Sequence, residues 1–130
     1  MEKIILFLIL IMTTLNVHAK WILVGMHEDA NFYIKTDSIK RKGHMITYWE
    51  MLDFKSIQKS ESEKQYSSFK MKNETNCNTE ESKTIFMAVY SGSMGSGQVI
   101  DTFKTVDTGF QDIIPDSVAH KVFQFVCSKK

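Results

Sequence analysis

The chain holds 130 residues, and its 16 Lys and Arg nearly balance its 15 Asp and Glu, so the formal net charge is +1 at pH 7. A balance of this kind gives no broad positive field, which disfavours nucleic acid or an anionic membrane as the main partner. The longest run of cations is Lys40-Arg41-Lys42, and the other lysines are spread along the chain.

The first segment of the chain has the pattern of a secretory signal peptide. Lys3 precedes an uninterrupted apolar run from Ile4 to Met12, and Val17-His18-Ala19 forms a small-x-small cleavage site. A membrane-spanning helix would need about 20 apolar residues. We therefore expect a signal peptide over residues 1–19, cleavage between Ala19 and Lys20, and a single exported domain over residues 20–130. No cysteine follows the apolar run to carry a lipid, so the periplasm, the cell surface and the medium all stay open as the destination.

Short apolar and aromatic stretches then alternate with polar turns, which is typical of an antiparallel sheet. We expect strands within residues 21–26, 32–35, 44–54, 65–77, 83–90 and 98–106. The connections would be a turn at 36–38, a charged turn at 40–43, a mobile hairpin loop at 55–64, a turn at 78–82 and a flexible glycine-rich loop at 91–97. The long third strand carries apolar residues on both faces, with Ile46, Tyr48, Leu52 and Phe54 on one face and Met45, Trp49 and Met51 on the other.

The hydrophobic period changes near the C-terminus, where one helix is predicted. Pro115 followed by Asp116 and Ser117 supplies a helix start. The residues that follow place an apolar stripe on one helical face, made of Val118, Ala119, Val122, Phe123 and Val126. A helix of this length is marginal alone, so it must lie on the sheet. Strands followed by one helix predict an α+β fold, an antiparallel sheet of about six strands with a C-terminal helix on one face.

Two cysteines, Cys77 and Cys127, are the only ones in the chain. In an exported protein an even pair predicts a disulfide. It would join the end of a strand to the end of the helix, and closing a loop of about 50 residues is worth roughly 4 kcal/mol in the chain-entropy model.

Motifs that could carry chemistry are better explained by structure. The glycines at 92–97 lack the Gly-Lys-Ser/Thr ending of a phosphate-binding loop. His27-Glu28-Asp29 has no partner at a metal-ligand spacing, and the scattered acids Asp101, Asp107 and Asp112 show no pairing. No G-x-S-x-G is present, and both cysteines are used in the disulfide. We therefore expect no enzymatic activity, no cofactor and no metal.

Binding is the function left by this elimination. The aromatic residues Trp21, Trp49, Tyr48, Phe69 and Phe103 are expected mainly in the core, but a sheet can still offer an aromatic side chain or a free edge to a partner. Asn73-Glu74-Thr75 has the form of a glycosylation sequon, which matters only in a eukaryotic secretory pathway.

An ordered set of short motifs over nearly all of residues 20–130 resembles the surface-adhesin protein E family of small exported bacterial proteins. The set comprises Trp21, Tyr33-Ile34 with Asp37-Ser38-Ile39, Gly43, Trp49, Ser68-x-Lys70 before Cys77, Tyr90-Ser91, Gly97-x-Val99, and Ile114-Pro115-x-Ser117 before Cys127. Two positions depart from the family pattern: Phe110 stands where Trp is common, and Asn76 where Asp is common.

The resemblance implies a C-terminal helix held by the disulfide on the concave face of the sheet, homodimers as one arrangement, and host extracellular-matrix proteins such as laminin and vitronectin as ligands. No binding residue of the family maps onto this chain. The alternatives are a periplasmic or secreted inhibitor of the lysozyme type, which would insert the loop Ser91–Gly97, or an envelope assembly factor. A hydrolase that uses unrecognised acids ranks last.

Overall fold

The computed structural model describes residues 20–104 and 109–129. The expected signal peptide, which ends at Ala19, lies outside the described residues, and so do Val106 and Asp107. Within the described ranges no helix is both long and apolar enough to cross a membrane.

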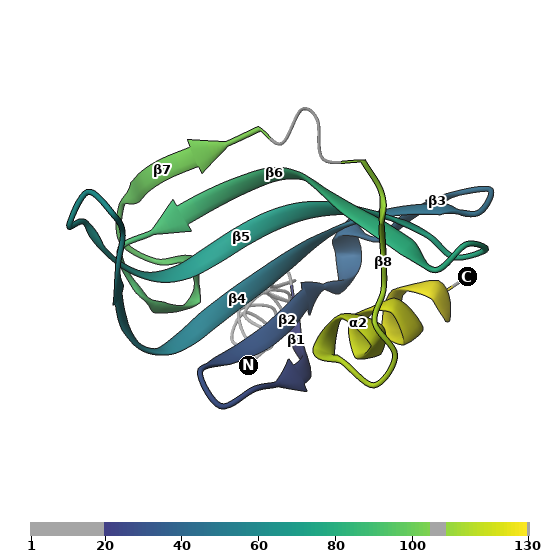
Figure 1. Ribbon diagram of the computed structural model, residues 1–130, viewed down its shortest axis with the longest axis horizontal. Coiled ribbons are helices and arrows are strands. Elements are labelled where there is room, and N and C mark those ends of the chain that lie inside the picture. Colours follow the sequence, from purple (N-terminus) through teal and green to yellow (C-terminus); the bar gives the residue numbers. More distant parts are fainter. Residues whose placement is uncertain (1–19, 105–108, 130) are drawn as a thin grey trace, which may run out of the picture.

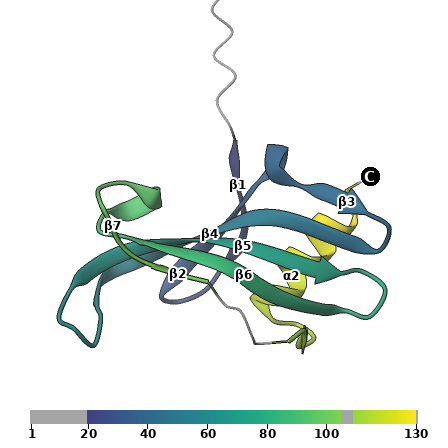
Figure 2. The same cartoon turned by 90° about the horizontal axis from the view of Figure 1, so that it is seen from above.

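An antiparallel sheet of eight strands forms the body of the molecule, and one helix lies on it (Figures 1 and 2). The main path runs β1-β2-β4-β5-β6-β7, while β3 pairs with β4 and β8 pairs with β6. This confirms the predicted fold class. The bounds of the elements are β1 Trp21–Met26, β2 Ala30–Lys35, β3 Lys40–Lys42, β4 Met45–Lys59, β5 Gln65–Asn76, β6 Glu81–Tyr90, β7 Val99–Phe103, β8 Gln111–Asp112 and α2 Val118–Cys127.

Two predicted connections are largely strand. Lys40–Lys42 pairs with Thr47, Ile46 and Met45, so it continues along the edge of β4 that β2 leaves free. The predicted mobile loop at 55–64 is reduced to a tight turn, because β4 runs to Lys59, which pairs with Gln65. Both stretches are polar because they are exposed, and each becomes a strand by pairing with the strand that follows it in the chain.

The two faces of the sheet differ in what covers them. We call the face that carries Ile46, Tyr48 and Glu50 of β4 the helix face, because α2 packs there, and the opposite face, which carries Trp49 and Met51, the far face. On the helix face the core joins Ile34, Ile46 and Tyr48 to Val122 and Val126 of α2. Burying the two valines stabilises by about 1.5–3 kcal/mol each, so the helix depends on the sheet.

The buried stripe of α2 differs slightly from the predicted one. Val118, Val122, Phe125 and Val126 pack against the core, at spacings of four, three and one. Ala119 is exposed and Phe123 is only half-buried, so the true stripe is rotated slightly toward Phe125.

Three contacts fix the ends of the helix. Ser117 caps the first turn, because its side chain accepts the His120 N–H at 3.1 Å. At the last turn, the disulfide Cys77–Cys127 ties α2 to the end of β5, with 5.8 Å between the Cα atoms. The Arg41 guanidinium also donates to the carbonyl oxygens of Cys127 (2.9 Å) and Lys129 (3.1 Å), which satisfies acceptors that a helix end leaves open.

Candidate binding site

The helix covers only one end of the helix face. In Figure 1, α2 lies at the right, while β7 and the β4–β5 turn lie at the left. An apolar groove of about 310 Å³ opens at this uncovered end. Six apolar or aromatic residues line it, namely Tyr66, Phe69, Met87, Val89, Ile100 and Phe103, together with the polar residues Lys59, Ser60, Glu61, Lys64 and Asp101. We call this site the apolar groove.

Strand register places these apolar side chains together. Phe69 of β5 lies opposite both Leu52 of β4 and Val89 of β6, and Met87 lies opposite Phe103 of β7. Directly opposed residues in antiparallel strands share one face, so the alternation of each strand delivers its apolar set to the same side.

An aromatic cluster forms one wall of the groove. Phe69 stacks on Tyr66 at 5.2 Å between ring centroids, and Phe54 meets both rings edge-on, at 5.2 Å from Phe69 and 5.8 Å from Tyr66. Such pairs contribute about 0.5–1.5 kcal/mol beyond the area they bury. The wall is therefore held in shape before any ligand arrives.

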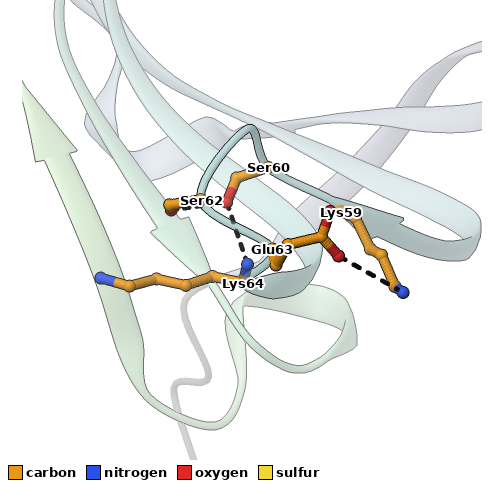
Figure 3. Close-up of polar contacts among 5 residues, drawn as sticks. All are labelled: Lys59, Ser60, Ser62, Glu63 and Lys64. Atoms are coloured by element: carbon orange, nitrogen blue, oxygen red, sulfur yellow. Dashed lines mark hydrogen bonds and ion pairs between the residues drawn. The ribbon is translucent and has the colours of Figure 1, made fainter.

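The polar rim of the groove is the turn between β4 and β5, drawn in Figure 3. Ser60 Oγ accepts the Lys64 N–H at 3.2 Å and lies 3.0 Å from Ser62 Oγ. Lys59 Nζ lies 3.7 Å from Glu63 Oε2, but both side chains are exposed, so this pair adds little stability. The turn is closed by two backbone bonds, from Ser60 N–H to the Lys64 carbonyl and from Glu63 N–H to the Ser60 carbonyl, both at 2.9 Å.

The prediction that the aromatic residues lie mainly in the core holds for Tyr48, which is 3% exposed. Phe69 is half-buried in the wall of the apolar groove, and Phe103 is 47% exposed at its rim. β7 is the last strand on the sheet path that the described residues form, and Phe103 lies exposed on it. Phe69 and Met71 lie two residues apart in β5, and so do Met87 and Val89 in β6. This spacing, which puts each pair on one face of its strand, was the available sequence clue to the surface.

A second, smaller cavity of about 190 Å³ lies between α2 and the sheet, and Glu50 faces it. The Glu50 carboxyl accepts a short hydrogen bond from Asn73 Nδ2, and Thr84 Oγ1 donates to Asn73 Oδ1 at 2.8 Å. Burial raises the pKa of Glu50 to about 7, and the Asn73 hydrogen bond opposes that rise. Burial also raises the pKa of the neighbouring Tyr48 hydroxyl.

The Glu50 cluster is buried and held together by hydrogen bonds between neighbouring strands. Asn73 uses both ends of its amide within the cluster and is 7% exposed. The sequon asparagine is therefore inaccessible to a glycan in the folded protein. Among the described residues that line this cavity, Tyr48 is the sole titratable group besides Glu50.

Two of the other acids singled out in the sequence, Asp101 and Asp112, are not brought together. Asp101 lies opposite Val89 and Asp112 lies opposite Glu81 of the same strand, which at 3.3–3.4 Å per residue separates them by roughly 27 Å. His27 and Asp29 form an exposed pair at 3.9 Å. Over residues 20–104 and 109–129, no group of three or more His, Cys, Asp or Glu side chains is placed to hold a metal ion.

The glycine-rich loop at 91–97 lies against the far face. Met94 N–H donates to Asp53 Oδ1 at 2.7 Å, and Gly95 N–H donates to Ser68 Oγ at 2.9 Å. Ser68 Oγ in turn donates to the Gly92 carbonyl at 2.6 Å. The amides of Met94 and Gly95 are thus bonded to the protein's own sheet, and those of Gly92 and Ser96 to carbonyls within the loop, so the geometry gives no support to a phosphate site or to an inserting inhibitory loop.

Comparison with known proteins agrees with this architecture. The family model of surface-adhesin protein E matches residues 21–128, and no curated protein sequence matches the chain. Crystal form II of Haemophilus influenzae protein E has a similar fold, with a TM-score of 0.65, 14% identity, and coverage of 87% of this chain and 91% of that one. The selenomethionine form of the same protein gives a TM-score of 0.63 and 16% identity over 87% of this chain and 89% of that one. The chain therefore belongs to the surface-adhesin protein E family.

Proposed function

We propose that the chain is exported, loses residues 1–19 by cleavage between Ala19 and Lys20, and acts in the bacterial envelope or at the cell surface as an adhesin. The disulfide Cys77–Cys127 supports an oxidising destination, and the family supports a binding role. The ligand is a protein, and host laminin and vitronectin are the ligands to test first, following the resemblance.

The observation that carries the proposal is the apolar groove. It combines half-buried aromatic side chains with a polar rim, which is the composition of protein-binding surfaces, where aromatic anchors supply most of the energy. A preshaped wall also reduces the ordering cost of binding.

Solid-phase binding to immobilised laminin and vitronectin tests the proposal. Phe103→Ser removes the exposed aromatic at the rim of the groove. Val99→Ser is the matched control, since Val99 is 52% exposed on the same edge strand and does not line the groove. Because anchor residues typically cost 2 kcal/mol or more when truncated, we expect Phe103→Ser to weaken binding about 30-fold, and Val99→Ser to change it less than threefold.

The absence of saturable binding to both proteins would refute laminin and vitronectin as ligands. Equal losses in Phe103→Ser and Val99→Ser would refute the groove as the binding surface. Homodimer formation stays a prediction. Light scattering by the purified protein, which gives its molar mass in solution, tests it directly.

A further inference from the structure

A hollow larger than the apolar groove lies on the far face, beside β3 and β4. It has a volume of about 690 Å³ and is lined by Lys35, Asp37, Ser38, Lys40, Arg41, Lys42, Met45, Thr47, Tyr48, Trp49, Lys72 and Glu74. Five of these residues are cationic and two are acidic, whereas the whole chain carries only +1. We call this site the lysine groove.

The fold gathers lysines that are far apart in sequence. Lys40 and Lys42 lie opposite Thr47 and Met45 of β4, so both share the far face with Trp49. Lys72 of β5 lies directly opposite Trp49. Ile34 of β2 is buried on the helix face. Because successive side chains of a strand point to opposite faces, the next residue, Lys35, lies on the far face with the other lysines.

Arg41, between Lys40 and Lys42, points to the other face, where it caps α2. Arg41 also lines the groove, but its guanidinium is bonded to the carbonyl oxygens of Cys127 and Lys129, so the other four cations of the lining, all lysines, are the ones left to meet a ligand.

The charge of these lysines is available to a ligand. Lys40 and Lys42 are exposed, and Lys35 and Lys72 are half-buried. Within residues 20–104 and 109–129, no ion pair joins any of the four to a carboxylate. Of the two acids in the lining, Glu74 is already engaged by Lys83 at 3.8 Å. Four like charges held around one hollow favour a polyanion that neutralises several of them together.

Trp49 supplies an aromatic surface among these cations. It is half-buried, and its ring meets Phe86 edge-on at 6.0 Å between centroids. Its backbone is held too, since Trp49 N–H donates to Ser38 Oγ at 2.9 Å. An indole ring has an apolar body that can pack against the ring of a sugar, so the groove offers charges for anionic substituents and one surface for the carbohydrate.

We propose that the lysine groove binds a sulfated polysaccharide. Lysine ammonium groups act as point charges without the planar fork of arginine, which suits sulfate groups spaced along a flexible chain. Single-stranded nucleic acid is usually held by several stacked aromatics, whereas this lining holds one indole. A flat anionic bilayer favours protruding apolar residues that insert, whereas this site is recessed. The choice of sulfate over phosphate esters rests on the exported location proposed above.

The test is a titration of the purified protein with a size-defined heparin octasaccharide. For single strands of nucleic acid, the slope of log affinity against log salt concentration is about −0.7 per neutralised charge. If four lysines each neutralise one sulfate with the same slope, affinity falls about 50-fold between 50 and 200 mM NaCl. The double variant Lys40→Gln/Lys72→Gln should weaken binding about 10-fold and halve the salt dependence. The matched control, Lys55→Gln/Lys121→Gln, removes two exposed lysines outside the groove and should stay within twofold of the parent.

Other outcomes overturn the proposal. They are equal losses in the groove and control variants, no saturable binding of the octasaccharide, equal binding of its desulfated form, or tighter binding of a thymidine oligonucleotide or of phosphatidylglycerol vesicles. A second readout is the indole N–H resonance of Trp49, which should shift on binding.

Thermal melts of each variant establish that the fold is kept. The laminin and vitronectin assays use the apolar groove on the opposite face, so the lysine variants should leave them unchanged, and the two proposals can fail separately.

Discussion

Replacing the buried Glu50 with glutamine should stabilise the protein at neutral and alkaline pH. Glu50 is 8% exposed, and its carboxyl is bonded to Asn73. Burial raises its pKa from 4.5 to about 7, so the folded state binds the proton more tightly than the unfolded state. Stability from this group is therefore complete below pH 4.5, falls as the pH rises from 4.5 to 7, and stays low above 7.

The magnitude follows from the size of the pKa shift. At about 1.4 kcal/mol per pKa unit, the rise from 4.5 to about 7 costs the folded state at most roughly 3 kcal/mol at pH 8. Glutamine keeps an oxygen that can accept the Asn73 hydrogen bond and carries no charge. We therefore expect Glu50→Gln to raise the melting temperature by roughly 10 °C at pH 8 and to change it little at pH 4.

The assay is circular dichroism melting of both proteins between pH 4 and pH 8, with Glu28→Gln, an exposed glutamate, as the matched control. The difference between Glu50→Gln and the parent should grow between pH 4.5 and 7. A difference that is the same at all pH values, or a variant less stable than the parent at pH 8, would show that Glu50 is not a desolvated carboxyl.

Three further changes probe how α2 is held on the sheet. Cys127→Ser should lower the melting temperature by about 10 °C, since a loop of 50 residues is worth up to roughly 4 kcal/mol; identical melting curves of the parent with and without reductant would contradict this. Arg41→Gln should cost about 1 kcal/mol in urea unfolding, because it frees two carbonyl acceptors at the end of α2, whereas Lys42→Gln should cost almost nothing; equal effects would mean that only charge matters. Gly25→Ala should destabilise by about 1–3 kcal/mol, since a Cβ there would lie 2.7 Å from Val118 Cγ1. Adding Val118→Ala should recover part of that loss, and no recovery would mean that this contact is not the cause.

The parts of the fold that could be predicted are those set by local pattern. The start of α2 at Ser117 and the strand at Trp21–Met26 follow from capping residues and from short apolar runs. The disulfide follows from the count of cysteines in an exported chain. Each of these features needs only a few neighbouring residues, which explains why the sequence alone was sufficient.

The features that escaped prediction depend on register between strands. Glu50, Asn73 and Thr84 come from three strands, and only their alignment makes them one buried cluster. The short strand at Lys40–Lys42 has no apolar residue and exists because β4 extends past the end of β2.

Both candidate surfaces escaped prediction for the same reason. The lining of the apolar groove comes from β5, β6 and β7, and that of the lysine groove from β2 to β5. The even spread of lysines along the chain concealed a clustered surface.

We propose above that a protein ligand binds at the uncovered end of the helix face. Amide hydrogen exchange with and without saturating vitronectin or laminin measures this most directly. We expect slowed exchange in the edge strand β7 (Val99–Phe103) and in the β4–β5 turn at residues 60–64, with unchanged exchange in β3 (Lys40–Lys42). Slowed exchange confined to β3 or to α2, with β7 unaffected, would contradict it.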